Sequence, residues 1–384
     1  MDYMLTQKDN LMSNNQKLKK VIKTYINIYD HRYNFEKNEV KHFEKNLNKN
    51  LKEIGLKNIK ELSVLNAGTG LEALVLQKKK FKRIYLADIN KKGINIINNL
   101  KKKNKRKYGN IFAKKLDFVK NDLIKNFPGI SYDLAYFQGV CHHFSDPAEG
   151  ITNIIRALNK NGVFFMRNYA SGSLNFFMVD FVRKFIKFED MKVFNQVFSV
   201  FFNMLIKKNF IIISQSDKSN AKKYFRTFCG DHLFVPYLFL YKVSDVDKFL
   251  RASGCIKIRN FETRNYFFKK KDLGNSNISF IYKKVKNVKS NNKIKLNHID
   301  QMKDIKYKEK YILDLISLLN KKLLKIRKLS SKTRVNLAIK LLFLIDFKRY
   351  FFNYTKNKIL IKNKKIFLNQ KNLFSKIYNS LNIY

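Results

Sequence analysis

Short apolar runs alternate with longer amphipathic stretches through the middle of the chain. The runs at 61–66 and 83–88 are mostly apolar and end at a glycine turn or an acid, which is typical of buried strands. The stretch 91–103 repeats apolar residues at helical spacing. Seven strands are predicted, at 61–66, 83–88, 110–116, 132–137, 162–167, 256–261 and 278–285. Helices are predicted between them at 72–77, 91–103, 146–158 and 244–252.

This alternation predicts an α/β domain over 61–285, with a parallel sheet covered by helices on both faces. Residues 1–60 show helical spacing and predict an N-terminal helical lead-in. Over 171–243 the alternation stops, and Phe, Met and Ile become frequent. This insertion is predicted to form a cap, with a turn at 231–236. Residues 286–384 are rich in Lys and Asn with helical stripes, and predict a basic helical extension.

The basic charge of the chain raises the question of a nucleic-acid partner. The 384 residues carry a formal net charge of +50, but 66 of the 79 basic residues are Lys and 13 are Arg. Arg is the better residue for phosphate forks and base edges, and here it is scarce and scattered. We therefore interpret most of the charge as compositional drift of an AT-rich genome. Attraction to RNA, anionic membranes or acidic glycans is the alternative.

The cysteines and apolar runs bound the class of protein further. Cys141, Cys229 and Cys255 form no C-x-x-C pair, so neither a zinc ribbon nor a disulfide framework is predicted, and no metal site is expected. No basic start leads into an apolar segment, so no signal peptide is expected. No apolar run reaches the roughly 18 residues of a membrane span. The expectation is a cytoplasmic protein, with contact at a membrane surface as the alternative.

A glycine turn follows the first predicted strand. Residues 64–73 read Val-Leu-Asn-Ala-Gly-Thr-Gly-Leu-Glu-Ala, and Gly68 and Gly70 let the backbone pass close to a ligand. Twenty residues after Gly68, the second strand ends on Asp88, where a carboxylate can accept both ribose hydroxyl hydrogens of a nucleoside. The alternative is a tight turn with no ligand, near a surface Asp that has no role in binding. With a strand before it and a helix after it, the motif predicts an adenosine cofactor.

Three later segments continue the series. Leu116-Asp117-Phe118 follows the third strand, residues 132–147 hold the fourth strand and a His142-His143 loop, and residues 155–165 lead into the fifth. In this order the motifs resemble the class I S-adenosylmethionine-dependent methyltransferases, especially those acting on small molecules, lipids and glycans. The resemblance covers about 60–285. It implies a seven-stranded Rossmann-like sheet and S-adenosylmethionine as the cofactor.

The resemblance also assigns cofactor contacts to residues that follow the strands. Those at the methionine part are Ala67, Gly68, Gly70, Gln138, Gly139 and Val140. Those at the adenosine part are Asp88 for the ribose, Ile89 and Phe118 beside the adenine, and Asp117 at its amino edge. Asn66 departs from the pattern, because many members carry an acid there. An Asn carbonyl can still accept a hydrogen bond, so cofactor binding is expected, although weaker.

Methyl transfer needs alignment of the acceptor with the methyl group and, for a hydroxyl, removal of a proton. His143 stands at a position that is often His in this family and is a candidate base, with a loop-stabilising role as the alternative. His232, beside Asp231 in the insertion, is a second candidate base or acceptor contact. Residues 167–169 end the fifth strand where they can touch the acceptor.

The insertion is where we expect acceptor specificity. Its phenylalanines predict an apolar cap, with ordinary core packing as the alternative. They are Phe176, Phe177, Phe181, Phe185, Phe198, Phe201 and Phe202. The acceptor is expected to be an oxygen or nitrogen of a small molecule, glycan precursor or lipid-linked metabolite.

Three alternative functions remain. The basic extensions are compatible with an RNA methyltransferase, although Cys141 follows Val140 and not the Pro of a C5-methyltransferase pair. The glycine turn and Asp88 also fit an NAD-dependent oxidoreductase, against which stand the late glycine motif and the fourth and fifth strands. The substitution at Asn66 leaves a non-catalytic methyltransferase-like binding protein as the third.

Overall fold

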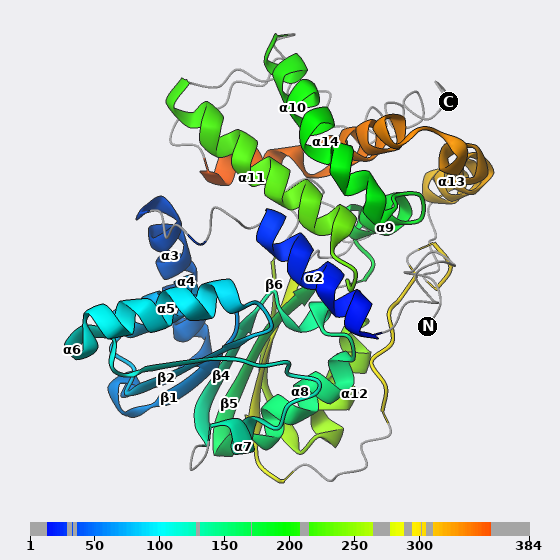
Figure 1. Cartoon of the computed structure of the whole chain (residues 1–384). Coiled ribbons are helices and arrows are strands. Elements are labelled where there is room, and N and C mark those ends of the chain that lie inside the picture. The colour runs from blue at the N-terminus through cyan, green and yellow to red at the C-terminus, as the bar shows by residue number, and fades with distance from the viewer. Residues whose placement is uncertain are drawn as a thin grey trace.

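A seven-stranded sheet forms the centre of the molecule (Figure 1). The computed structural model describes residues 14–28, 33, 37–127, 131–169, 171–207, 215–263, 277–287, 294–300, 302–304 and 310–354. The strands are β1 (Ser63–Asn66), β2 (Arg83–Asp88), β3 (Ile111–Lys115), β4 (Tyr132–Gln138), β5 (Leu158–Tyr169), β6 (Cys255–Thr263) and β7 (Asn277–Lys284). Their order across the sheet is β3-β2-β1-β4-β5-β7-β6. The predicted seven-stranded Rossmann-like sheet is confirmed, and no strand end differs from its prediction by more than four residues.

The sheet is mixed and not purely parallel. Strands β1 to β5 pair in parallel, whereas β7 lies antiparallel between β5 and β6. The antiparallel β7 departs from the predicted parallel sheet, because it pairs in the opposite direction with both of its neighbours. The strand order reverses between β1 and β4, and in such sheets ligands bind at the carboxyl ends of the strands on either side of this point.

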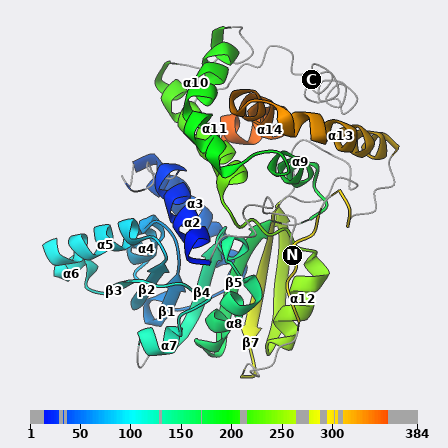
Figure 2. The ribbon, with the colours of Figure 1, turned by 45° about the vertical axis from the view of Figure 1, so that its right-hand side comes forward.

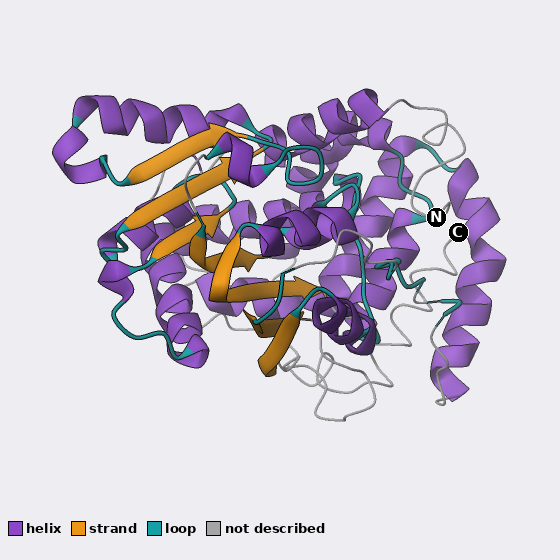
Figure 3. Ribbon diagram, turned by 90° about the horizontal axis from the view of Figure 1, so that it is seen from below, coloured by secondary structure: helices purple, strands orange, loops and turns teal. Residues whose placement is uncertain are grey.

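Helices cover both faces of the sheet, as seen from below in Figure 3. They are α3 (Lys37–Ile54), α4 (Leu71–Lys78), α5 (Lys91–Lys103), α6 (Lys105–Tyr108), α7 (Leu123–Asn126), α8 (Pro147–Arg156) and α12 (Val243–Ala252), with short 3-10 turns η2 (Ile59–Glu61) and η3 (Cys141–His143). Consecutive residues of a strand pack on opposite faces of the sheet. Val64 and Ile84 belong to the core on one face, whereas Leu65 and Tyr85 belong to the core on the other. Because both faces of the sheet are buried at its centre, β1, β2 and β4 are nearly continuous apolar runs.

A helical cap lies beyond one end of the strands (Figure 2). It contains α9 (Leu174–Arg183), η4 (Phe188–Asp190), α10 (Met191–Lys207) and α11 (Gln215–Phe234), together with α2 (Asn14–Ile28), α13 (Lys310–Lys328) and α14 (Ser331–Tyr354). The cap has its own apolar core, which joins α9, α10 and α11 to α2, α13 and α14. All seven phenylalanines singled out in the insertion are at most 5% exposed. Core packing therefore accounts for them.

The turn predicted at 231–236 is wrong for its first four residues. Helix α11 runs on to Phe234, so that Asp231 and His232 lie in its last turn. The end of the helix is held by Arg183, whose guanidinium donates to the carbonyls of His232 (3.1 Å) and Val235 (2.8 Å). Because the Arg183 guanidinium satisfies these carbonyls, the helix can end here without the turn residues that usually do so.

A buried ion pair joins α14 to η4 within the cap. Arg334 Nη2 lies 2.6 Å from Asp190 Oδ1, and Arg334 Nε donates to Asp190 Oδ2 at 3.1 Å. Both residues are buried, and Asp190 also accepts from the backbone N–H of Lys187. The bidentate geometry satisfies both charges, so the pair depends on both partners being present.

Replacement of one partner tests this fastening. We expect Arg334→Met to lower the free energy of unfolding by about 3–5 kcal/mol, because it leaves the Asp190 carboxylate buried without its partner. The double variant Arg334→Met/Asp190→Leu removes both charges and is expected to recover most of the loss. Chemical denaturation followed by circular dichroism measures both. A single variant as stable as the wild type would contradict a structural role for the pair.

Candidate active site

The glycine turn after β1 contacts the acid that ends β2. The backbone N–H of Gly68 donates to Asp88 Oδ2 at 3.1 Å. Gly68 and Gly70 have φ angles of 133° and 97°, which L side chains rarely adopt. The structure therefore brings together the two motifs that the sequence analysis paired.

Helix α5 approaches the same turn closely through Gly93. A Cβ atom added to Gly93 would lie 2.3 Å from the carbonyl oxygen of Thr69, so only glycine allows this approach. The sequence analysis missed Gly93, although a glycine inside a predicted helix is a signal of close packing. Asn90 caps the start of this helix by accepting from the N–H of Lys92 at 3.0 Å.

The Asp88 carboxyl group is half-buried, and its pKa is raised. Oδ1 accepts from the backbone N–H of Asn90 at 2.8 Å. Desolvation by burial raises the pKa of Asp88 to about 7, the charge of Glu72 adds to the effect, and backbone hydrogen bonds oppose it. The carboxyl group can therefore change its protonation state near neutral pH.

Tyr33 from the N-terminal lead-in reaches this turn, which the sequence analysis did not foresee. Asn90 Nδ2 donates to the Tyr33 hydroxyl at 2.5 Å, and Lys92 Nζ lies 4.7 Å from the centre of the Tyr33 ring. Tyr33 is buried. No local motif signals this contact, because 57 residues separate the two partners.

Asn66, at the end of β1, is a buried polar group in need of a partner. Its side chain is 0% exposed, and among the described residues neither its Oδ1 nor its Nδ2 has a hydrogen-bond partner. An unsatisfied buried amide costs about 1–3 kcal/mol, so its presence needs an explanation. A polar ligand beside the glycine turn would satisfy it.

The other proposed adenosine contacts differ in their exposure. Asp117 is half-buried and its Oδ1 accepts from the N–H of Val119 at 2.9 Å. Phe118 is buried in the core, with its ring centre 5.2 Å from that of Phe137, and Ile89 is half-buried next to Asp88. Asp117 and Ile89 are thus partly accessible, whereas Phe118 is part of the core.

After β4, the side chain of Gln138 is held by hydrogen bonds, whereas Gly139 leaves its backbone exposed. Gln138 Oε1 accepts from Tyr136 Oη at 2.8 Å and from Asn50 Nδ2 at 3.1 Å. Gly139 is exposed, and no atom lies within 4 Å of where its Cβ would be. Val140 is half-buried, and Ala67, in the glycine turn opposite, is buried.

The two candidate bases lie in one cluster beneath the cap. His143 Nδ1 donates to the carbonyl of Tyr237 at 2.8 Å, and His143 Nε2 lies 3.9 Å from Asp231 Oδ1. His232 Nδ1 donates to the carbonyl of Phe228 at 2.9 Å. Because a carbonyl only accepts, both rings carry their proton on Nδ1 when neutral, which leaves Nε2 as the basic atom. Burial lowers the pKa of His143, although the charge of Asp231 opposes this.

Tyr169, the last residue of β5, connects the members of this cluster. Its ring centre lies 4.0 Å from that of His142, 5.5 Å from that of His232 and 4.3 Å from that of Phe176. Its hydroxyl donates to Asp231 Oδ2 over a long 3.5 Å. The sheet and the cap thus meet in a group of aromatic rings around Asp231.

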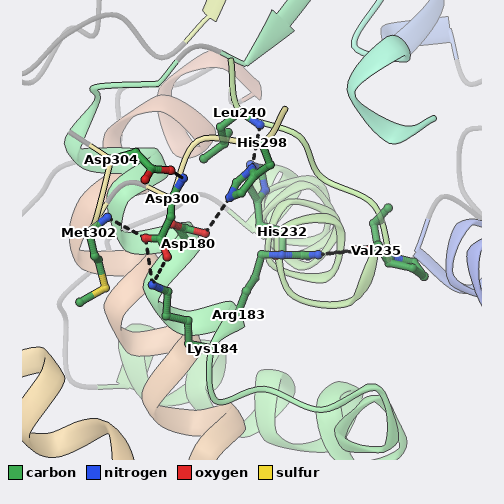
Figure 4. A network of polar contacts seen from close by, with 11 residues as sticks. Asp180, Arg183, Lys184, His232, Val235, Leu240, His298, Asp300, Met302 and Asp304 are labelled. Atoms are coloured by element: carbon green, nitrogen blue, oxygen red, sulfur yellow. Dashed lines mark hydrogen bonds and ion pairs between the residues drawn. The ribbon is translucent and has the colours of Figure 1, made fainter. Parts of the chain in front are cut away.

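A polar network holds the cap side of the cluster in place (Figure 4). Lys184 Nζ pairs with Asp300 Oδ2 at 2.8 Å, and His298 Nε2 lies 3.4 Å from Asp180 Oδ1. The backbone N–H of Leu240 donates to His298 Nδ1 at 3.1 Å. These contacts tie α9, the segment 294–300 and the loop after α11 together.

Comparison with known proteins identifies the class of domain. Residues 65–166 match the family model of the methyltransferase domain. The match covers the glycine turn, Asp88, the strand β4 and His143. Together with the strand order, it shows that the chain carries a class I methyltransferase domain, whose methyl donor is S-adenosylmethionine. The chain is therefore an enzyme of this class.

Solved structures show distant similarity. One is magnesium protoporphyrin IX methyltransferase from Synechocystis PCC 6803, at 12% identity over 64% of this chain and 84% of that chain, with a TM-score of 0.37. Another is an S-adenosylmethionine-dependent methyltransferase from Mesorhizobium loti, at 14% identity over 62% and 96%, with a TM-score of 0.38. No curated protein matches the sequence of the chain. None of these comparisons identifies the acceptor.

Among the described residues, no helix is long and apolar enough to cross a membrane. Within the same part of the chain, no three His, Cys, Asp or Glu side chains are grouped to hold a metal ion.

The raised pKa of Asp88 predicts that cofactor affinity depends on pH. If Asp88 holds the ribose, its ionised carboxylate would accept both hydroxyl hydrogens, whereas the protonated form would lose an acceptor site. Since the pKa of Asp88 is raised to about 7, the Kd of S-adenosylhomocysteine should be constant above pH 7 and rise by up to tenfold per pH unit below it.

Calorimetric titration from pH 5.5 to 8.5 measures this dependence, with Asp88→Asn as the matched control. The variant should bind more weakly and with no step near pH 7. A flat wild-type profile, or the same step in the variant, would show that Asp88 does not hold the ribose.

Proposed function

We propose that the chain transfers the methyl group of S-adenosylmethionine to an oxygen or nitrogen of an acceptor that binds beneath the cap. The acceptor is a small molecule, a glycan precursor or a lipid-linked metabolite. One observation carries the proposal. The Gly68–Asp88 contact lies at the carboxyl ends of β1 and β2, and His143 follows β4 beside the cap, so donor and base can meet across the switch point of the sheet.

The residues present fit the cofactor. Asn66 offers an unsatisfied buried amide to the methionine part, the glycine turn gives room for close approach, and Asp88 offers its carboxylate to the ribose. Gly139 and Val140 would line the methionine end, and Asp117 with Ile89 would border the adenine. When bound, S-adenosylmethionine supplies a methyl group already activated by the positive sulfur. The protein's task is therefore alignment and proton removal.

His143 is placed to remove the proton. Its Nδ1–H donates to the carbonyl of Tyr237, which fixes the ring and leaves Nε2 as the proton acceptor. Burial lowers the pKa of His143, so the neutral, basic form dominates at pH 7. Asp231, 3.9 Å from Nε2, would stabilise the imidazolium that forms. His232 lies on the other side of Tyr169 and would contact the acceptor.

The surface of α13 supports contact with an anionic membrane, where a lipid-linked acceptor would be found. Leu313 is 49% exposed and Leu324 is 68% exposed, and the exposed Lys321, Lys325 and Lys328 lie beside them on the helix. Exposed leucines flanked by lysines are typical of helices that lie at a lipid surface.

The test of the proposed function is transfer of an isotopically labelled methyl group. Wild-type protein incubated with labelled S-adenosylmethionine and a fractionated metabolite extract should yield a labelled product in specific fractions. His143→Gln should lower the rate of product formation by about 10²–10⁴-fold, because the general base is lost. The Kd of S-adenosylhomocysteine should stay within twofold in this variant.

Three results would count against this assignment. Equal rates in His143→Gln would remove the role of the base. Binding of NADH in place of S-adenosylhomocysteine would favour an oxidoreductase. Binding of neither ligand would favour a non-catalytic binding protein.

A further inference from the structure

Asp231 is a buried carboxylate with one unsatisfied oxygen. The residue is 5% exposed, and among the described residues its Oδ1 has no hydrogen-bond partner. Its Oδ2 accepts the long 3.5 Å hydrogen bond from Tyr169. A buried charge without a close partner is costly, so it marks a place where a ligand completes the site.

Other buried carboxylates of the cap are paired with cations. Arg334 binds Asp190 at 2.6 Å, and Lys184 binds Asp300 at 2.8 Å. The charge of the buried Arg183 acts on Asp231, but its guanidinium donates its hydrogen bonds to the backbone carbonyls at the end of α11 (Figure 4). Within this part of the chain, Asp231 thus differs from Asp190 and Asp300 in accepting no hydrogen bond from a Lys or Arg side chain.

We infer that the acceptor is a protonated amine, whose ammonium group donates a hydrogen bond to the unsatisfied Oδ1 of Asp231. This inference rests on the proposed function and names its substrate class. The atoms His143 Nε2 and Asp231 Oδ1 are 3.9 Å apart, so one nitrogen can lie about 2.8 Å from both, with an angle of roughly 90° between the two directions. An ammonium group carries enough hydrogens to serve both atoms, whereas an alcohol hydroxyl carries one.

Tyr169 brings an aromatic ring beside Asp231. Its hydroxyl donates to Asp231 Oδ2 at 3.5 Å, and its ring centre lies 4.3 Å from that of Phe176 and 5.5 Å from that of His232. Aromatic faces attract an ammonium group through their quadrupole, most strongly where water is excluded. We therefore expect Tyr169 to lie beside the ammonium group.

The reaction then balances as an N-methylation. The ammonium group gives one proton to His143 Nε2, and the freed nitrogen lone pair attacks the methyl carbon. A nitrogen–carbon bond forms and the sulfur–carbon bond breaks, with its electron pair left on sulfur. The products are the N-methylated ammonium ion, S-adenosylhomocysteine and the proton, which His143 passes to water.

Two substitutions test the charge of Asp231 without any acceptor. Asp231→Asn removes the buried charge and keeps the shape, so the ligand-free protein should melt about 2–4 °C higher than the wild type. The matched control, Asp190→Asn, breaks a satisfied ion pair and should melt lower. If Asp231→Asn also melts lower, Asp231 has a structural role and the inference is overturned.

Binding of two probes of matched shape tests the substrate class. Phenethylammonium and 2-phenylethanol are titrated at pH 7.5 into full-length protein saturated with S-adenosylhomocysteine. The amine should bind wild-type protein at least tenfold more tightly than the alcohol, and Asp231→Asn should lose this preference. Equal affinities, including no detectable binding of either probe, overturn the inference, as does a preference that survives in the variant.

S-adenosylhomocysteine affinity separates this inference from the proposed function. Wild-type protein and Asp231→Asn should bind it equally, because Asp231 lies on the acceptor side. Failure of the wild type to bind it would overturn the proposed function, whereas normal binding without amine preference would overturn the substrate class alone.

Discussion

The hydrogen bond from the Gly68 N–H to the Asp88 carboxylate joins the two turns on which the site depends. It holds the end of β1 against the end of β2, at 3.1 Å, next to the point where the strand order reverses. The turn can form only because Gly68 adopts a φ of 133° and because Gly93 lets α5 approach the backbone of Thr69. Asn66, Asp88 and the residues after β4 are thereby directed to one edge of the sheet.

A second constraint acts where the sheet meets the cap. Asp231 comes from the last turn of α11, His143 from the loop after β4 and Tyr169 from the end of β5. The cap holds its share of this cluster through paired charges, such as Arg334 with Asp190, and through an apolar core shared by α9, α10, α11 and α14. These contacts offset the cost of leaving Asp231 Oδ1 buried without a hydrogen-bond partner among the described residues.

The strands could be predicted because both faces of the sheet are buried, which makes each strand a short apolar run ending at a polar residue. The cofactor motif could be predicted because Gly68, Gly70 and Asp88 have a fixed spacing. The long-range contacts around the candidate site could not be predicted, since they join residues far apart in the chain. Asn90 meets Tyr33, and His143 meets Tyr237, 94 residues away.

The continuation of helix α11 through Asp231 also could not be predicted from the sequence. Residues 231–236 have the composition of a turn, and the cation that satisfies the end of α11 is Arg183, on a different helix. Likewise, the Lys- and Asn-rich composition of residues 286–384 gave no sign that α14 completes the core of the cap. Both features depend on tertiary contacts that override local propensity.

Hydrogen–deuterium exchange with and without S-adenosylhomocysteine tests most directly whether this edge of the sheet binds the cofactor. Slower exchange is expected at residues 66–70, 88–90, 117–119 and 138–140, with little change in α13. Protection elsewhere, or none at the glycine turn, would contradict the placement of the cofactor at the Gly68–Asp88 contact.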